Sequence, residues 1–394
     1  MSFTLPPKEI GATPSSHLNL VRAITAMAVV AGHIRSLFLV EYGSIENPNI
    51  FHKLFYFFTG LGHQGVIAFF VLSGLLVGGS VLKIVKENKW SWTEYIAARL
   101  SRLYIVLIPG LIITFLFDTI GMALAKNSSI YTGNSLFGNV ITFQIIDAQT
   151  FKNFWGSLFF LQTIITRPFG SNTPLWSLAN EFWYYVLFPF CLFFFLKNGR
   201  SILMRLFMGI VATGIFFFIG WNISFLFLVW LLGIVVFILQ KNNTSSSKTL
   251  HYLFIFLIGL QLFATLSISR FSLIENSMLM DFLLGVSISL FLWGILSLSK
   301  KEVSNQYKWL ARTGAGFSYT LYVVHLPLVI FIHGIIGSHT NYFLEGRWNP
   351  DIPHIAFILT IFLVVLFFAY LVSLFTENKT SLVRRIISDL IKKH

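Results

Sequence analysis

Ten apolar stretches, each close to the length that crosses a lipid bilayer, determine what this chain can fold into. Hydrophobic residues make up 56% of its 394 residues and charged residues only 11%, a balance that soluble domains of this size do not have. The sequence therefore predicts an all-α, polytopic membrane bundle of about ten spanning helices. The expected spans are residues 18–40, 63–82, 103–125, 175–196, 202–219, 223–239, 250–268, 279–298, 317–337 and 354–375.

Lys and Arg indicate the orientation of the bundle, because cytoplasmic loops are enriched in both. Most of them fall on one side when both termini are placed in the cytoplasm, including Lys83, Lys86 and Lys89 in the first inner loop. The long outer loop at 126–174 carries three basic residues, diluted over a length that weakens the rule. The net charge of +13 is thereby explained by topology and contact with membrane lipids. No cluster of basic and aromatic residues predicts nucleic-acid binding.

The domain organisation expected from these patterns is simple. Residues 1–17 are predicted to be a cytoplasmic segment, 18–376 one transmembrane domain, and 377–394 a basic cytoplasmic tail. No cleavage pattern follows the first span, so we expect a retained helix and not a signal peptide. The polar run 242–247 is predicted to be a flexible inner loop. Residues 154–165 are apolar but too few to span, which favours a re-entrant or interfacial element of the outer loop.

The single cysteine of the chain, Cys191, lies inside an apolar span. One cysteine excludes an intramolecular disulfide and any cysteine-based metal site, so a small buried apolar residue is the expected role. We expect no metal cofactor.

Two ionisable residues, Arg22 and His33, lie eleven positions apart in the first span. Eleven helical residues return to nearly the same face and rise about 16 Å. Because an ionisable side chain in hydrocarbon costs about 2.5 to 3.5 kcal/mol, two on one face predict a polar cavity inside the bundle. His33 is the candidate general base.

A carboxylate, Glu181, follows the segment Leu-Trp-Ser-Leu at 175–178. The aromatic residues around it, Trp176 and Tyr184 among them, fit an interfacial belt, but a belt needs no carboxylate inside the helix. Counted from the outer helix ends, Glu181 lies about 9 Å deep and His33 about 10 Å deep. We predict that the carboxylate pairs with the imidazole, raising its basicity and fixing its tautomer. The alternative is a structural ion pair between helices.

An arginine pair, Arg99 and Arg102, occupies the inner end of the third span. Residues at i and i+3 share a helix face, and guanidinium forks match phosphate oxygens, which favours a phosphate site. The lysines of the preceding loop need no such role, because the topology alone explains them.

A second histidine, His325, lies mid-membrane three residues after Tyr322 and thus on nearly the same face. A lone buried histidine is more often a packing residue with satisfied hydrogen bonds. Lining of the cavity is therefore favoured over catalysis for His325.

Small residues gather in the second span, where Phe-Phe-Val-Leu-Ser-Gly at 69–74 is followed by Gly78 and Gly79. Small residues in membrane helices allow close packing of backbones, which is the first interpretation here. Access for a thin ligand beside Ser73 is the second.

Five motifs occur in one order along the chain. They are Arg22-x10-His33, Phe-Phe-Val-Leu-Ser-Gly at 69–74, Arg99-x-x-Arg102 followed by Pro109, Leu-Trp-Ser-Leu-x-x-Glu at 175–181, and Ser-Tyr-x-x-Tyr-x-x-His at 318–325. In this order they resemble acyltransferase family 3, bacterial inner-membrane enzymes that O-acylate surface and exported glycans. The resemblance runs from about 18 to 375. Two departures are Asn19, where the family commonly has Asp, and Leu75, where Phe is usual.

The resemblance implies a role for each motif. Arg22 and His33 become essential, Arg99 and Arg102 become part of an acyl-CoA site, and Glu181 becomes an active-site carboxylate. We expect Arg22 and Ser73 to bind the acyl-CoA as well. Acetyl-CoA is the expected co-substrate, and its pantetheine arm is comparable in length to the rise of about 16 Å between Arg22 and His33. Some relatives carry a fused soluble domain, so a second transfer step would need another protein here.

The expected acceptor is a glycan or lipid-linked saccharide on the outer side of the membrane. Its contacts are predicted to come from Trp176, Tyr184, Tyr322 and His325 inside the bundle and from Trp155 in the outer loop. The acyl group, the acceptor and the formation of a homo-oligomer stay open at this point.

Two other function classes compete with an enzyme. A transporter or channel for a small anion would use the same buried ionisable residues, but no internal repeat or matched pair of broken helices is seen in the sequence. An assembly or scaffold protein would leave the buried Arg, His and Glu unexplained. Release of free CoA from acetyl-CoA and a glycan acceptor would distinguish the enzyme from both.

Overall fold

Helices make up nearly all of the regular structure. This computed structural model describes residues 12–126, 128–132, 137, 139–197, 200–240, 248–298, 302–339 and 347–392. Across these ranges there is no β-strand, only two isolated bridges, Leu39 with Trp348 and Gln162 with Thr166. Most of the predicted N-terminal segment and the predicted loop at 242–247 lie outside the described residues. The prediction of an all-α membrane bundle is confirmed.

The helices are α1 (Ala12–Phe38), η1 (Tyr42–Ser44), α2 (Ile50–Phe58), α3 (Gly62–Ser73), the π-helix η2 (Gly74–Gly78), α4 (Gly79–Lys86), α5 (Trp92–Leu124), α6 (Ser129–Thr132), α7 (Ile145–Ala148), α8 (Phe151–Leu158), α9 (Leu175–Phe195), α10 (Ile202–Leu239), α11 (Lys248–Arg270), α12 (Ser277–Leu298), α13 (Asn305–Gly316), α14 (Ser318–His339), α15 (Ile352–Phe375), η5 (Glu377–Lys379) and α16 (Thr380–Lys392).

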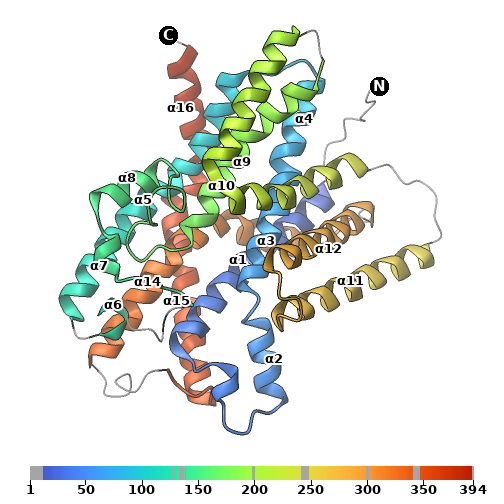
Figure 1. Cartoon of the computed structure of the whole chain (residues 1–394). Helices are drawn as coiled ribbons and strands as arrows, with labels where there is room; N and C mark the ends of the chain where they lie inside the picture. Colours follow the sequence, from blue (N-terminus) through green and yellow to red (C-terminus); the bar gives the residue numbers. More distant parts are fainter. Residues whose placement is uncertain are drawn as a thin grey trace. The chain divides into compact units, whose positions relative to one another are not determined.

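Nine helical segments of the described chain are long and apolar enough to cross a membrane. The sequence predicted about ten spans, and the difference lies in α10, whose 38 residues would extend about 57 Å, well beyond a hydrocarbon core of about 30 Å. Gly220 interrupts this helix with φ 77° and ψ 175°, a left-handed conformation that favours glycine. The ribbon changes direction between the two halves (Figure 1), which correspond to the predicted spans 202–219 and 223–239.

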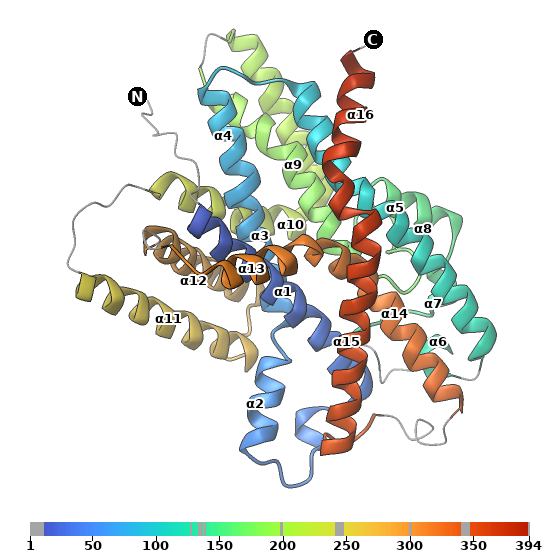
Figure 2. The same cartoon turned by 180° about the vertical axis from the view of Figure 1, so that it is seen from behind.

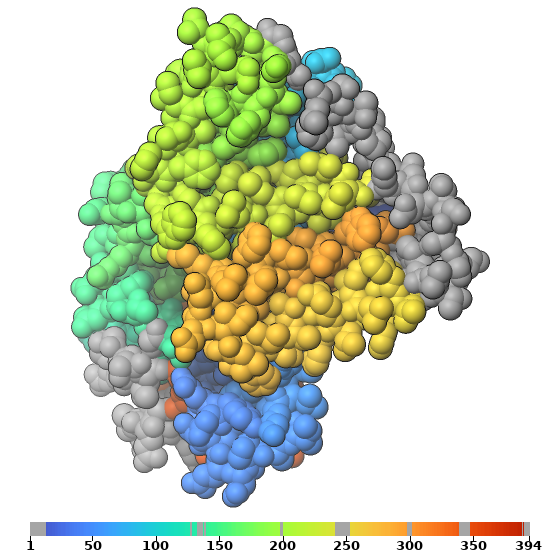
Figure 3. Space-filling view, turned by 45° about the vertical axis from the view of Figure 1, so that its right-hand side comes forward, coloured from blue at the N-terminus to red at the C-terminus, as the bar shows by residue number. Residues whose placement is uncertain are grey.

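The chain divides into two compact units. Unit 1 comprises Met1–Thr25, Gln64–Ser91 and Asn180–Gly314, and unit 2 comprises Ala26–His63, Trp92–Ala179 and Ala315–His394. In unit 1, α10 packs on η2 and on α12, and α11 packs along α12. Figure 3 shows α11 and α12, in yellow and orange, forming one surface together. Apolar side chains of α11 such as Phe256 (66% exposed) face outward, as expected of a helix in contact with lipid.

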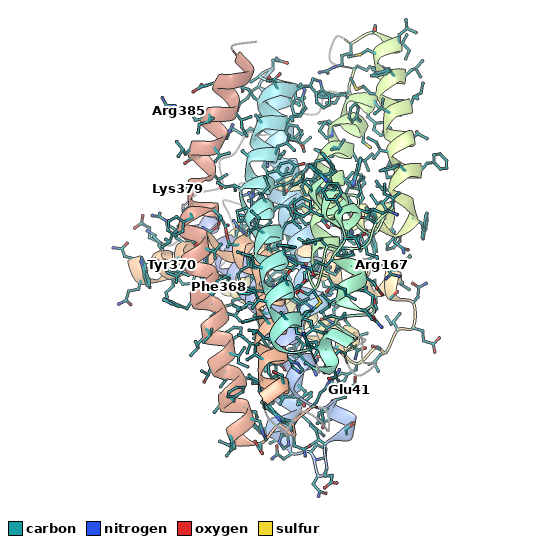
Figure 4. All side chains as sticks on the ribbon, turned by 90° about the vertical axis from the view of Figure 1, so that its left-hand side faces the viewer. Glu41, Arg167, Phe368, Tyr370, Lys379 and Arg385 are labelled. Atoms are coloured by element: carbon teal, nitrogen blue, oxygen red, sulfur yellow. The ribbon has the colours of Figure 1, made fainter. Side chains whose placement is uncertain are left out.

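Unit 2 is organised around α14, the most buried of its long helices, which packs between α5 and α15. Figure 2 shows α16 following α15, with α16 packed along α5 and α15 packed along α14. Lys379 and Arg385 lie toward one end of this unit and Glu41 toward the other (Figure 4). That separation is expected if the first two residues are cytoplasmic and Glu41 is on the outer side.

The outer loop contains three short helices, α6, α7 and α8. Only the first part of the apolar segment 154–165 is helical, because α8 ends at Leu158. Phe160 and Thr163 then take positive φ values of 58° and 70°, which L-residues rarely adopt inside a helix. The second part is therefore a turn, in which the Leu161 N–H donates to the Gly156 carbonyl (2.7 Å).

Candidate active site

Two histidines form a hydrogen-bonded pair in unit 2. Nδ1 of His33, on α1, lies 2.8 Å from Nε2 of His325, on α14. The two ring planes are 14° from parallel and their centroids are 5.0 Å apart. His325 is fully buried, whereas His33 keeps part of its surface exposed. The pair therefore has one fully buried ring and one ring that is partly exposed.

The hydrogen bonds of His325 define the tautomer of both rings. Its Nδ1 lies 2.8 Å from the Tyr322 carbonyl and 3.1 Å from the Leu321 carbonyl. Because a carbonyl oxygen only accepts, Nδ1 of His325 must carry the hydrogen, and Nε2 of the neutral ring is then an acceptor. Nδ1 of His33 must donate to it, which leaves the lone pair of His33 on Nε2. This is the state in which an imidazole can take a proton.

The turn before His325 is held by the beginning of α9. The Tyr322 hydroxyl lies 2.6 Å from the Ser177 hydroxyl and 3.2 Å from the Pro174 carbonyl. Tyr322 and Ser177 are both 7% exposed, so this contact is shielded from water and strong. Tyr322 thus serves at least to fix α14 against the Thr-Pro-Leu-Trp-Ser segment.

Glu181 belongs to a second polar cluster, in unit 1. Its Oε1 atom accepts hydrogen bonds from the Ser73 hydroxyl (2.7 Å) and from the Tyr185 hydroxyl. The indole N–H of Trp230 donates to Ser73 Oγ (3.1 Å). Among the described residues of unit 1, Oε2 of Glu181 accepts no hydrogen bond. One carboxylate oxygen is therefore fixed within unit 1 by two hydroxyl donors.

Close backbone packing creates this cluster. A Cβ atom on Gly74 would lie 1.8 Å from the Trp230 carbonyl oxygen, and one on Gly233 would lie 2.0 Å from the Val71 carbonyl oxygen. Only glycines allow this approach of η2 to α10, which brings the Trp230 indole to Ser73. The predicted role of the small residues in helix packing is confirmed. The π-helix begins directly after Ser73, and such irregular turns are frequent at functional sites.

The predicted phosphate-binding residues are divided between the units. Arg99 and Arg102 lie in the first turns of α5 in unit 2, in the helical register that places them on one face. The Arg99 guanidinium lies 5.5 Å from the ring centre of Tyr95, which restrains its orientation. Arg22 belongs to the part of α1 that is in unit 1. Their joint action on one ligand stays a prediction.

The aromatic residues predicted to bind substrate differ in their surroundings. Tyr184 is fully buried in unit 1, where its hydroxyl donates to the Ile223 carbonyl (3.0 Å) and its ring contacts Phe70. That environment favours packing for Tyr184. Trp155 on α8 is 40% exposed and thus accessible to a large acceptor, and Trp176 is half-buried. Their roles in binding stay predictions.

The histidine pair and the Glu181 cluster each contain one residue whose role was not predicted from the sequence. His325 was expected to line a cavity, and the structure makes it the hydrogen-bond partner of His33. Trp230 carries no motif of its own, so nothing in the sequence pointed to its bond with Ser73. The predicted pairing of Glu181 with His33 would join residues of different units and stays a prediction.

A buried carboxylate in unit 2, Asp118 on α5, was also not anticipated. It is fully buried, and its Oδ2 accepts a hydrogen bond from the backbone N–H of Ser171 (2.7 Å). Burial and, second, the Asp118 carboxylate raise the pKa of Tyr131 in α6 above its usual range. Asp118 therefore anchors the end of the outer loop. A carboxylate late in an apolar span was the available signal.

A family model described as an acyltransferase domain matches residues 16–374, nearly the whole chain. The chain belongs to acyltransferase family 3. The matched range includes all five motifs that resembled this family, and membership favours a membrane acyltransferase over a channel or a scaffold. No curated protein and no solved structure gives a significant match to the chain.

Proposed function

We propose that this member of acyltransferase family 3 is an O-acyltransferase of the bacterial cytoplasmic membrane. It moves an acetyl group from acetyl-CoA in the cytoplasm to a hydroxyl of a glycan or lipid-linked saccharide at the outer face. The observation that carries the proposal is the His33–His325 pair (2.8 Å), which leaves Nε2 of a partly exposed histidine as a base. O-acyl transfer needs a base at the attacking hydroxyl.

The reaction follows from this base. Nε2 of His33 takes the proton of the acceptor hydroxyl as the oxygen attacks the thioester carbonyl carbon, and a C–O bond forms. The tetrahedral intermediate then collapses, and the C–S bond breaks. The proton on His33 passes to the departing CoA sulfur, so that the products are the ester and the free thiol. His33 ends in the state in which it began.

His325 supports the charged state of His33. When Nε2 of His33 takes the proton, the hydrogen bond from its Nδ1 to Nε2 of His325 becomes charge-assisted, and such bonds are about twice as strong as neutral ones. Because the bond strengthens as the proton is transferred, it contributes to the rate and not only to binding. The neutral ring of His325 thereby does part of what a carboxylate does in other catalytic pairs.

The acyl-CoA phosphates are proposed to bind Arg99 and Arg102, with Arg22 as a further cation. Two guanidinium groups one helical turn apart offer paired donors to phosphate oxygens. Ser73 is proposed to adjoin the thin pantetheine arm, because its hydroxyl lies at the start of η2 and donates to Glu181. The nucleotide can then stay on the cytoplasmic side while the thioester reaches His33.

The saccharide acceptor is proposed to contact the outer loop at α8. Phe151, Trp155 and Phe159 form a row of exposed rings, with 77%, 40% and 53% exposure, and Trp155 stacks on Phe159 at 5.8 Å. Flat apolar rings suit the C–H face of a sugar. Trp176 and Tyr322 are proposed to lie nearer the reacting hydroxyl.

The test uses the purified protein in lipid vesicles with acetyl-CoA and an oligosaccharide that has free hydroxyls. We expect CoA release that depends on the acceptor, and a gain of one acetyl mass on the oligosaccharide. His33→Ala should abolish both signals. Acceptor-independent CoA release, or none from a folded protein with several oligosaccharides, would contradict the proposal.

A further inference from the structure

Pro327 leaves one carbonyl of α14 without its helical donor. The carbonyl of residue i normally accepts from the N–H of residue i+4, and for Val323 that residue is Pro327, which has no N–H. His325 lies between the two. A buried carbonyl without a donor costs about 1–3 kcal/mol, so the turn that carries His325 needs a donor from outside the helix.

Asn172 supplies this donor. Its side-chain Nδ2 lies 2.9 Å from the Val323 carbonyl oxygen and 3.0 Å from Thr114 Oγ1 on α5. The Thr114 hydroxyl donates in turn to the Gly110 carbonyl (2.8 Å), so its oxygen is available to accept. Both amide hydrogens of Asn172 are thus used, and the side chain links α5 to α14.

Tight packing leaves water little access to this carbonyl. Asn172 and Thr114 are fully buried, and Val323 is fully buried beside them. A Cβ atom on Gly110 would lie 2.3 Å from Val323 Cγ1, so α5 and α14 meet closely at this height. A protein donor is therefore the means of satisfying the carbonyl here.

We propose that Asn172 is a positioning residue for the His33–His325 pair. The turn that it stabilises contains Leu321 and Tyr322, whose carbonyls accept from Nδ1 of His325. A shift of that turn would move Nε2 of His325 away from His33. The hydrogen bond would then no longer fix which ring nitrogen of His33 carries the hydrogen. This inference rests on the proposed function, because it assigns Asn172 an effect on the proton transfer.

The experiment is a double-mutant cycle of Asn172→Ala and Pro327→Ala in the full-length protein in vesicles. Pro327→Ala restores an N–H that Val323 can accept from, which makes Asn172 dispensable. We expect Asn172→Ala to lower kcat about 10- to 100-fold, the scale of a small misplacement of a catalytic group, with KM for acetyl-CoA nearly unchanged. In the Pro327→Ala background, the same substitution should change kcat less than about threefold.

Asn153→Ala is the matched control, because the Asn153 amide also donates to a buried carbonyl, that of Ala148 (3.1 Å), but away from α14. It should show no coupling to Pro327→Ala. Equal losses of kcat for Asn172→Ala in both backgrounds would overturn the inference, as would a loss confined to KM.

Apparent Tm values for the same four proteins separate this inference from the proposed function. Coupling in Tm does not require turnover, so it should appear whatever reaction the protein catalyses. If wild type turns over no acetyl-CoA, the proposed function fails while coupling in Tm still supports the Asn172–Val323 bond. Coupling in Tm without coupling in kcat would reduce Asn172 to a structural role and overturn the positioning inference.

Discussion

Nδ1 of His33 lies 2.8 Å from Nε2 of His325, and the carbonyls behind His325 determine which ring donates. A histidine on α1 is thus oriented by α14, a helix almost three hundred residues further along the chain. A neutral pair suits a site inside a membrane bundle, because a fixed charge would be costly there.

Replacement of His33 should abolish acyl transfer while the protein still folds and inserts into the membrane. We expect His33→Ala to lower kcat about 10²- to 10⁴-fold, the range that general-base catalysis contributes. Acceptor-dependent CoA release measures this, and membrane insertion should be normal. His52→Ala, in the cap of α2, is the control and should keep wild-type turnover. Activity of His33→Ala within a few-fold of wild type would exclude His33 as the base.

Replacement of the supporting ring should affect rate and not binding. His325→Phe keeps an aromatic ring but has no acceptor for Nδ1 of His33, so we expect kcat to fall about 10²-fold or more, with KM for acetyl-CoA changed little. Because the two histidines act as a unit, His33→Ala combined with His325→Phe should be no worse than His33→Ala alone. Additive losses would show that the two residues act independently.

Glu181→Gln tests the carboxylate of the second cluster. The amide keeps an acceptor for Ser73 but removes the negative charge, so we expect turnover to fall strongly while acyl-CoA binding changes little. Initial rates and a binding isotherm for CoA measure the two quantities. Weaker binding at unchanged turnover would assign Glu181 to substrate binding or structure instead.

The arginine pair should govern affinity for the co-substrate. Arg99→Ala or Arg102→Ala is expected to raise KM for acetyl-CoA about tenfold, since a charge-assisted hydrogen bond contributes about 1.5–3 kcal/mol, while kcat stays nearly constant. Lys89→Ala in the preceding loop serves as the control for loss of surface charge. A structure with CoA should place phosphates at Arg99 and Arg102 and the sulfur toward His33, and a nucleotide on the outer face would contradict the topology.

Gly74→Ala should destabilise unit 1. Its methyl group would meet the Trp230 carbonyl oxygen at 1.8 Å, and overpacking costs about 1–3 kcal/mol or more, so the apparent Tm should drop by several degrees. Gly214→Ala in α10 is the matched control, because no atom beyond the adjacent residues and backbone of its own helix lies within 4 Å of the added methyl. There the better helix propensity of Ala should leave Tm equal or slightly higher. An unchanged Tm for Gly74→Ala would mean that α10 can move away.

The fold was largely predictable because membrane spans are encoded by length and hydropathy alone. Gly220 is one example: the sequence indicated two spans, and α10 is broken at Gly220 into two helical halves that match them. The change of direction at the break could not be predicted from the apolar residues, because it depends on a backbone conformation that glycine permits but does not require.

The sequence singled out candidate residues for the site but could not indicate which of them are hydrogen-bonded to one another. His33, Glu181 and Ser73 stood out because polar groups in apolar spans are rare. Their partners depend on relative helix heights, and depth counted from helix ends fails when helices tilt and begin at different levels. His325 lies well inside α14 and His33 only a few residues from the end of α1, yet the two touch.

The neutral histidine pair has a consequence for energy coupling. In the proposed transfer the hydroxyl proton passes to His33 and leaves on the CoA thiol, so each turnover moves acetyl and hydrogen in opposite directions without moving net charge. The catalytic cycle is therefore electroneutral. An acyltransferase that works in this way should run at the same rate whether the membrane is polarised or collapsed, and the cell could modify its exterior without drawing on the membrane potential.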